Sequence, residues 1–261
     1  MAVTICRTTY SGVLRDNMDF STALADANGK MVAQGLTLPG HLGSIPAALA
    51  VVVERFAGDI HPGDMFILND PFDGGMHLPD IFIFQPLYHE GKRVAFAATI
   101  SHHSDVGGRV PGSNASDSTE IYQEGLRIPP LKLFDQGKRN ETMWSLIEKN
   151  VRIPIQVLGD LRAQLAACHI AETQFAELLE RYGLEKVTLY MEEVIDYAER
   201  LTRAAIAELP DGQWSFEDWI DDDGIDLDRP IRLFVTLTKT GEEITVDWTG
   251  SSEQVKGAIN N

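Results

Sequence analysis

The sequence has few cysteines, no long apolar run and no leader-like N-terminus. Cys6 and Cys168 are the only cysteines among 261 residues, and no CxxC pair occurs, which argues against a disulfide framework. No segment approaches the length of a membrane span, and the first residues contain no apolar region followed by a cleavage site. These absences predict a soluble, unexported protein in a reducing, cytoplasmic setting.

Basic residues are also scarce. Lys and Arg total 22 against 39 Asp and Glu, so the formal net charge is −17. Such a charge repels nucleic-acid phosphates and anionic membrane surfaces, and neither is expected as a partner. The chain contains no GxxxxGK[ST] loop and no GxGxxG turn after a strand, so it offers no recognisable site for ATP. Seven histidines and many carboxylates, in contrast, permit binding of a divalent cation.

Two antiparallel hairpins are predicted in the N-terminal half. Residues 19–34 form the first, because Asn28-Gly29 suits a tight turn between two apolar segments. The runs DIFIFQPLY and RVAFAATIS form the second, which turns at residues 89–92. The short apolar run at 65–69 is predicted to be a buried strand.

Helices are predicted by apolar residues that recur with helical spacing. The first covers about residues 44–57, with Ser44 as its N-cap. Two longer ones, over about 155–182 and 185–209, are separated by Gly183-Leu184 and should form an antiparallel helical hairpin.

The fold class that follows is α+β, with antiparallel hairpins, a central helical hairpin and a C-terminal antiparallel sheet. Residues 111–139 are predicted to be a long irregular segment because of their Pro, Gly and Ser content. The predicted regions are a metal-site α/β region at 1–139, a helical hairpin region at 140–209 and the start of a second β-rich domain at 210–261.

The segment NDPFDGGMHLPD at 69–80 contains three aspartates and a histidine, more ionisable residues than a turn between two strands requires. His77 and Asp80 lie at the start of one strand of the second hairpin, and His102 and His103 lie at the end of the other. Pairing of the two strands brings these ends together, which can build a site of two imidazoles and one carboxylate. Such a site leaves coordination positions open on Mn, Fe or Zn, as a catalytic metal requires.

Strand alternation limits which histidine can take part. If the strand stays regular, His102 and His103 point to opposite faces, so only one joins the site. The other is then available for hydrogen bonding or proton transfer. Asp70, Asp73 and Asp105 are predicted hydrogen-bond partners of the imidazole N–H groups.

A plainer interpretation stays open for these residues. Asp70 and Asp73 can cap turns, and the histidines can be ordinary surface residues, because no short motif of this kind is diagnostic by itself. His41 in PGHLGS and Glu124 in YQEGLRIPP stand beside glycines and are interpreted either as walls of the site or as capping and turn residues. The run at 221–223 does not match a calcium-binding EF-hand loop and is predicted to be a solvated acidic turn.

Eight blocks, taken in chain order, resemble the hydantoinase B/oxoprolinase family. They span nearly the whole sequence: RTTYSGVLRDNMDFSTAL, LPGHLGSIPAAL, ILNDPFDGGMHLPDIFIFQP, SHHSDVGG, PGS, QEGLRIPP, DWIDDDGI and VDWTGSS. That family includes the B-type subunits of ATP-dependent N-methylhydantoinases, the corresponding half of 5-oxoprolinases and one subunit of acetone-type carboxylases.

The resemblance implies a division of labour between two subunits. An A-type partner binds ATP and phosphorylates a carbonyl or amide oxygen, and the B-type part completes the reaction. In the carboxylase relatives, two histidines and an aspartate hold a divalent metal, manganese in the acetone enzyme; these correspond to His77, Asp80 and His102. The resemblance thus selects His102 over His103, and we predict His103 or Asp105 as a general base.

Family members extend further at both ends, so the chain is expected to correspond to the N-terminal half of a B-type protein, without its initial helix. The predicted function is the metal-bearing part of a hetero-oligomer that hydrolyses a cyclic amide, such as hydantoin, N-methylhydantoin or 5-oxoproline. Manganese is the expected metal, with zinc or iron as alternatives. Other functions stay open: the metal-bearing part of an ATP-dependent ketone carboxylase, a non-catalytic truncated assembly module, and an oxygenase with non-haem iron.

Overall fold

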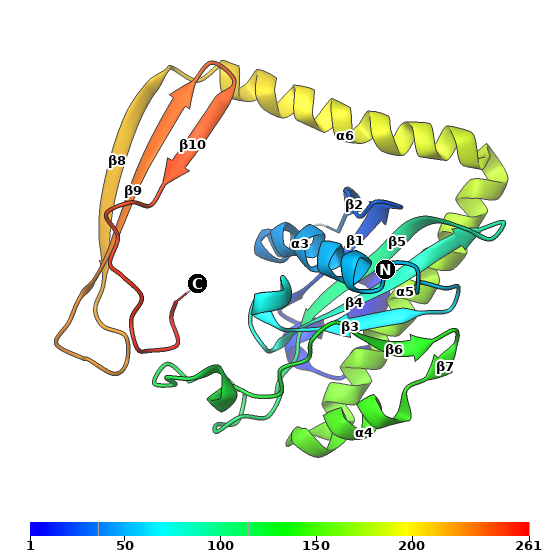
Figure 1. The fold of residues 1–261 in the computed structure, drawn as a ribbon, viewed down its shortest axis with the longest axis horizontal. Helices are drawn as coiled ribbons and strands as arrows, with labels where there is room; N and C mark the ends of the chain where they lie inside the picture. The colour runs from blue at the N-terminus through cyan, green and yellow to red at the C-terminus, as the bar shows by residue number, and fades with distance from the viewer. Residues whose placement is uncertain (36, 114, 261) are drawn as a thin grey trace. The chain divides into compact units, whose positions relative to one another are not determined.

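A computed structural model describes residues 1–35, 37–113 and 115–260, and its main feature is a seven-stranded antiparallel sheet (Figure 1). The strand order is β2-β1-β5-β4-β3-β6-β7, with antiparallel pairing throughout. The strands are β1 (Phe20–Asp26), β2 (Met31–Gln34), β3 (Met65–Leu68), β4 (Asp80–His89), β5 (Lys92–His102), β6 (Leu131–Asp135) and β7 (Lys138–Arg139). Both predicted hairpins, the short strand β3 and the α+β class are therefore confirmed.

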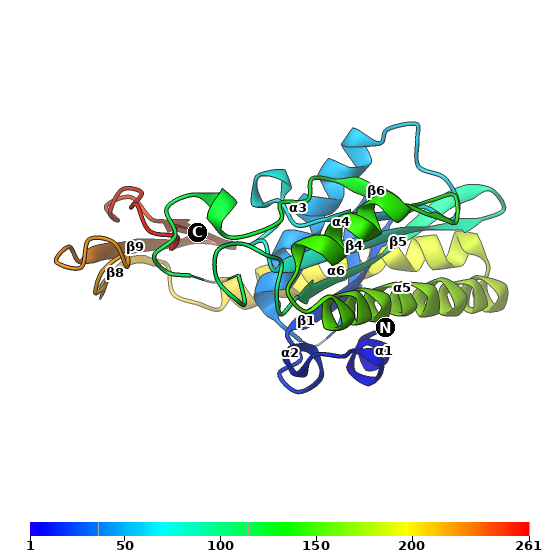
Figure 2. The same ribbon diagram turned by 90° about the horizontal axis from the view of Figure 1, so that it is seen from below.

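Helices cover both faces of this sheet (Figure 2). One face is covered by α3, and the other by α5 with α1 and α2, while α4 packs against α5. The bounds are α1 (Ala2–Thr8), α2 (Gly12–Arg15), α3 (Pro39–Arg55), α4 (Glu141–Asn150) and α5 (Pro154–Tyr182). Within the ranges that the structure describes, no helix has both the length and the apolar character needed to cross a membrane.

The two faces of the sheet differ in chemistry, because successive side chains of a strand alternate. The main apolar core lies between the sheet and α3. Its strand members include Phe66, Leu68, Phe82, Phe84, Phe96, Ala98 and Ile100, and its helix members are Leu42, Ile45, Ala48, Leu49 and Val52. Each large side chain buried there contributes about 1.5–3 kcal/mol. On the face toward α5, β5 instead presents buried Thr99 and Ser101, and buried His103 directly follows the strand.

The helix predicted at 44–57 begins five residues earlier than expected, so the prediction of Ser44 as its N-cap is wrong. In α3, Pro39 is the first residue, and the Ser44 hydroxyl donates to the carbonyl of His41 inside the helix (2.7 Å). Glycine and proline have low helix propensity, but burial of Leu42, Ile45 and Leu49 against the sheet outweighs it in this stretch. The earlier start places His41 in the first turn of α3.

The irregular segment predicted at 111–139 ends earlier than expected. Its last third forms β6 and β7, which extend the sheet beyond β3. A register shift between Met65 and Phe66 accompanies the pairing of β3 with β6. These strands are short and lie at an edge, and their alternation is too brief to stand out in the sequence.

The helix α6 (Leu184–Ala207) follows α5 after Gly183, as predicted, but most of its apolar face is not packed. Val187 and Met191 are its buried residues. Val194 and Leu201 lie farther along this helix and are 48% and 58% exposed. Helical periodicity indicates that a helix has an apolar face but not what covers that face.

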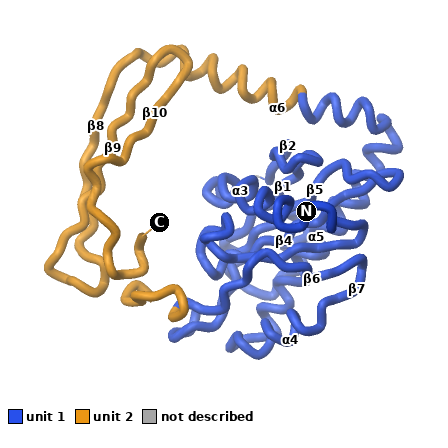
Figure 3. Tube along the Cα trace, viewed as in Figure 1, with its two compact units in different colours: residues 1–113, 124–192 blue, residues 114–123, 193–261 orange. Residues whose placement is uncertain are grey.

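The described chain divides into two compact units (Figure 3), residues 1–113 with 124–192 and residues 114–123 with 193–261. The second unit holds a three-stranded antiparallel sheet in the order β10-β9-β8. Its elements are η2 (Ile121–Gln123), β8 (Gly212–Ile220), β9 (Ile231–Thr240) and β10 (Glu243–Asp247). The predicted C-terminal antiparallel sheet is confirmed; the three-region division made from the sequence stays a prediction.

In the second unit, Asp223 is buried and does not belong to a solvated turn as predicted. Its carboxylate accepts hydrogen bonds from the backbone N–H groups of Asp226 (2.7 Å), Ile225 (2.9 Å), Gly257 (3.0 Å) and Lys256 (3.1 Å). These bonds stabilise the charged form and lower the pKa of Asp223 to about 2. The side chain therefore ties its own turn to the segment at 256–257.

The loop between β3 and β4 is fastened on two sides. The buried side chain of Asn69 donates to the carbonyls of Leu78 (2.6 Å) and Leu126 (2.9 Å) and accepts from the N–H of Ile128 (2.6 Å). On the other side, Gly74 has a φ of +87° and lies against α3, where an added Cβ would be 2.8 Å from a backbone nitrogen of the helix. The loop that carries His77 is thereby held in a narrow range of positions.

We expect Gly74→Ala to destabilise the protein more than Gly91→Ala does. Both glycines have positive φ (+87° and +77°), so each alanine costs about 1–2 kcal/mol from backbone conformation alone. An alanine at 91 meets nothing within 4 Å, whereas one at 74 displaces the backbone of α3, which adds about 1–3 kcal/mol. Urea unfolding of the two variants measures the difference; equal losses would show that the close approach to α3 carries no cost.

Candidate metal centre

Three of the predicted site residues meet at one end of the sheet. Asp80 begins β4 and lies opposite His102 at the end of β5, and His77 lies three residues before Asp80. The Asp80 carboxylate is 3.3 Å from His102 Nδ1 through Oδ1 and 3.3 Å from His77 Nδ1 through Oδ2. One potential ligand atom from each residue lies within 4.8 Å of the others, and the two rings are 5.0 Å apart at 72°.

The carboxylate at the centre of this cluster is buried and needs a partner. The side chain of Asp80 is 1% exposed, while those of His102 and His77 are 20% and 42% exposed. Among the described residues, Asp80 Oδ1 and His77 Nδ1 are buried atoms without an aligned hydrogen bond. A buried carboxylate is costly unless it is paired or coordinates a metal. Two imidazoles and one carboxylate with free lone pairs therefore fit a divalent cation such as Mn, Fe or Zn.

Asp19 also reaches this cluster, although it was not predicted from the sequence. β1 pairs with β5 so that Phe20 lies opposite Ser101, which brings Asp19 beside His102. The N–H of His102 donates to the carbonyl of Asp19 (3.0 Å), and Asp19 Oδ2 is 4.0 Å from His102 Nδ1. Asp19 is the first residue of the predicted hairpin at 19–34, but its place in the site follows only once β1 is known to pair with β5, which is distant in sequence.

His41, predicted as a wall of the site, faces the cluster from α3. Its Nε2 is 3.5 Å from Asp80 Oδ2 and 3.6 Å from Asp19 Oδ1, and its Nδ1 is 3.5 Å from the Ser21 hydroxyl. The helix thus contributes an imidazole above the strand ends. His41 and Asp19 thus lie beside the group of His77, Asp80 and His102, whose potential ligand atoms are within 4.8 Å of one another.

Burial lowers the pKa of the His41 and His102 imidazoles, whereas the Asp19 and Asp80 carboxylates raise it. Burial alone would lower the pKa of His102, but the nearby Asp80 carboxylate, with Asp19, raises that pKa overall. For His41 burial dominates, and its pKa is lowered despite the charges of Asp80 and Asp19. The His102 ring therefore lies in the more negative environment, which also favours a bound cation.

Glu124 borders the cluster on the side of His77. Burial raises the pKa of the Glu124 carboxyl, and the charge of His77 opposes that rise. The backbone that follows is closely packed, because Gly125 has a φ of +143° and an added Cβ would be 2.6 Å from the carbonyl oxygen of Val106. Glu124 is thus a third acidic group near the potential ligands.

His103 and Asp105 point elsewhere, and their geometry gives no support to a role as general base. His103 is fully buried on the face toward α5, where its Nε2 is 3.0 Å from Gln164 Oε1, and burial lowers its pKa. Asp105 pairs with Arg152 through the guanidinium (2.8 Å) and the backbone N–H (2.7 Å). Among the residues that the structure describes, the expected contact of Asp105 with an imidazole is not found.

The structure agrees with the plainer interpretation of Asp70 and Asp73, in which both residues belong to a turn. The Asp70 carboxylate accepts from the N–H of Phe72 (3.0 Å) and pairs with Arg127 (3.0 Å). Asp73 ends the short η1 helix (Pro71–Asp73), and its N–H donates to the carbonyl of Asp70 (3.0 Å). Neither carboxylate lies within ion-pair distance of a histidine among the described residues, so the predicted contact with imidazole N–H groups is not observed.

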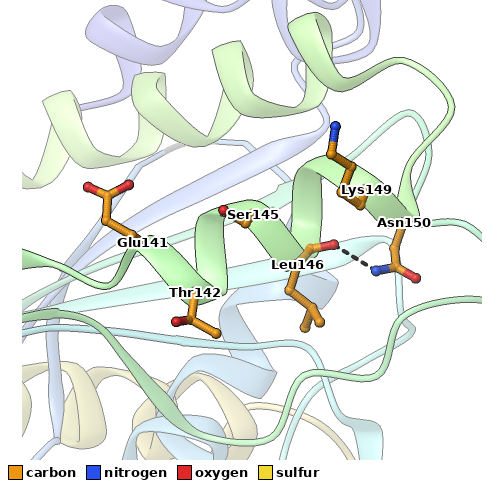
Figure 4. A pocket seen from close by; sticks show the side chains of 6 residues that line it. All are labelled: Glu141, Thr142, Ser145, Leu146, Lys149 and Asn150. Carbon is orange, nitrogen blue, oxygen red and sulfur yellow. Dashed lines mark hydrogen bonds between the residues drawn. The ribbon is translucent and has the colours of Figure 1, made fainter.

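A hollow on the outer side of α4 has no comparable chemistry (Figure 4). It is lined by Glu141, Thr142, Ser145, Leu146, Lys149 and Asn150, all from one helix. The Asn150 amide donates back to the carbonyl of Leu146 (2.7 Å). Its lining includes none of the clustered histidines and aspartates at the strand ends, so this hollow is distinct from the candidate centre.

Comparison with known proteins gives consistent results along the whole chain. The sequence profile of the hydantoinase B/oxoprolinase family matches residues 1–261. The B-type subunit of a putative D-/L-hydantoinase from Pseudomonas sp. (strain NS671) is 34% identical over 260 residues, which cover 96% of this chain and 44% of that protein.

Two solved structures share the fold. The ATP-dependent caprolactamase from Pseudomonas jessenii superposes with a TM-score of 0.91 at 36% identity, over 99% of this chain and 44% of that one. Acetone carboxylase in its nucleotide-free form gives 0.92 at 20% identity, over 99% of this chain and 36% of that one, a likeness that concerns the fold alone. The chain spans less than half the length of these relatives.

Proposed function

Because the chain belongs to the hydantoinase B/oxoprolinase family, we propose that it is the metal-bearing, B-type part of an ATP-dependent cyclic amide hydrolase. The substrate class is a hydantoin, 5-oxoproline or a similar lactam. The observation that carries the proposal is the meeting of His77, Asp80 and His102 around a buried carboxylate oxygen that lacks an aligned partner. Family membership alone would not distinguish a working centre from a degenerate one.

The side chains of the cluster have separable roles in this proposal. His77, Asp80 and His102 hold the metal, and Asp19 and His41 lie close enough to complete or orient the ligand set. A divalent metal held there would polarise a substrate oxygen and lower the pKa of a water molecule. Glu124, whose pKa is raised by burial and which interacts electrostatically with His77, is the carboxyl proposed to exchange a proton with substrate.

An A-type partner supplies the ATP chemistry in this proposal. The relatives include a protein named as the B-type component of a hydantoinase and an ATP-dependent caprolactamase, and this chain has no recognisable nucleotide loop. The partner would phosphorylate the amide oxygen, and the B-type part would direct water to the activated carbon and open the ring. A hetero-oligomer in a reducing, cytoplasmic setting is the expected form.

The metal centre itself is tested by metal content. We expect the purified protein to bind one Mn²⁺, Zn²⁺ or Fe²⁺ tightly, and His77→Ala to lose most of that binding because one of three ligands is removed. His169→Ala is the matched control, since its side chain is 71% exposed on α5 and pairs with Glu172 (3.4 Å) of the same helix. Elemental analysis and titration measure both; unchanged binding in His77→Ala would contradict the assigned centre.

Substrate class is tested with the A-type partner present. We expect the co-purified pair to release phosphate from ATP in step with ring opening of hydantoin, 5-oxoproline or caprolactam, and His77→Ala to abolish this coupling. Acetone with bicarbonate is the comparison substrate, and carboxylation in place of ring opening would favour the ketone carboxylase alternative. Metal binding without turnover of any of these would favour a non-catalytic role, and oxygen consumption would reveal an oxygenase.

A further inference from the structure

Two hydrogen bonds hold the backbone on either side of Asp80. On one side, the backbone N–H of His103 donates to the carbonyl of Pro79 (2.8 Å). On the other, the side-chain amide of Gln164, in α5, donates to the carbonyl of Ile81 (2.8 Å). The residue before this candidate ligand is thus held by the neighbouring chain segment within the sheet, and the residue after it is held from α5.

His103 and Gln164 are also bonded to each other. His103 Nε2 is 3.0 Å from Gln164 Oε1, and since an amide oxygen only accepts, the imidazole nitrogen donates. The Gln164 amide nitrogen is in addition 3.3 Å from the Thr99 hydroxyl. Both His103 and Gln164 are fully buried, so water cannot replace a bond that is lost. This His103–Gln164 pair connects α5 to both sides of Asp80.

The His103–Gln164 pair also affects the orientation of His102. Because His102 and His103 are consecutive residues at the end of β5, they point to opposite faces, and holding one ring orients the other. Anchoring His103 beneath α5 therefore fixes the direction in which His102 faces Asp80, 3.3 Å away. Outer partners of this kind restrict the orientation of metal ligands, and their removal weakens metal binding.

We propose that Gln164, acting through His103 and through the carbonyl of Ile81, is a positioning residue that sets the spacing between Asp80 and His102. It touches neither the ligand atoms nor the substrate. The inference rests on the proposed function for the identification of the cluster as a metal centre.

The test is Gln164→Leu, which preserves volume and removes both the acceptor for His103 and the donor to Ile81. We expect the Kd for Mn²⁺ to rise about 10- to 100-fold and the absorption spectrum of the Co²⁺-loaded protein to change at saturating metal. A metal-free measurement accompanies these: hydrogen exchange of the His103 amide, which bonds to Pro79, should be faster than in the wild type.

Gln85→Leu is the matched control. Gln85 lies in β4, is 3% exposed, and its amide donates to Glu172 of α5 (2.9 Å), so it belongs to the same interface without flanking Asp80. We expect the wild-type Kd, spectrum and His103 exchange in this variant. An unchanged Kd, spectrum and exchange in Gln164→Leu would overturn the proposal, as would an equal effect of Gln85→Leu on all three. If Gln164→Leu does not fold, Gln164→Glu retains the acceptor for His103 and removes the donor to Ile81; its Kd should lie above the wild-type value, and a wild-type Kd would overturn the proposal.

The two proposals fail in different ways. A wild-type protein that binds no divalent metal, or binds it without ATP-dependent turnover beside its partner, contradicts the proposed function. The exchange comparison in metal-free protein still decides whether Gln164 holds the strand ends. Conversely, normal metal binding and turnover in Gln164→Leu would leave the proposed function intact and remove Gln164 as a positioning residue.

Discussion

The register between β1, β5 and β4 is the constraint on which the candidate centre depends. It places Asp19, His102 and Asp80 side by side at one end of three adjacent strands, on the face that α3 covers. A shift of one residue in either pairing would turn the affected side chain to the opposite face. The register is maintained by the apolar core farther along the same strands, where Phe82, Phe84 and Ile100 pack under α3. Packing in the core and chemistry at the strand ends are therefore linked by the backbone.

The two faces of the sheet have different roles. The face toward α3 is apolar along most of its length and ends in the acidic and imidazole groups, with His41 of the helix above them. The face toward α5 contains buried Thr99 and Gln85, whose polar partners Gln164 and Glu172 lie on that helix. Hydrogen bonds form only at specific geometries, unlike apolar contacts. The hydrogen bonds to α5 therefore fix the direction and register in which the sheet packs on that helix. The polar layer can thus define how the sheet lies on α5.

Local signals in the sequence predicted much of the fold, and long-range pairing accounts for what they missed. The hairpins were predictable because alternation and turn residues lie within a few positions of each other, and the second hairpin alone brings His77, Asp80 and His102 together. Asp19 was missed because β1 pairs with β5 across many intervening residues. The start of α3 was misplaced because tertiary burial of Leu42 and Ile45 overrides the glycines and prolines around them. Asp105 was assigned to an imidazole although its partner is Arg152, from a distant part of the chain.

The spread of the cluster along the chain has a consequence for how the protein acquires it. Asp19 and His102 lie far apart in sequence, and they become neighbours only after β5 has paired with β1. Before that step, the chain offers at most the nearby pair His77 and Asp80, and two ligands hold a divalent ion weakly. A cation bound by the full set would join the beginning of the sheet to its middle, and its binding free energy would add to the stability of the folded sheet because the unfolded chain lacks the site. A metal ion bound at the centre would then indicate that these strands of the sheet have paired.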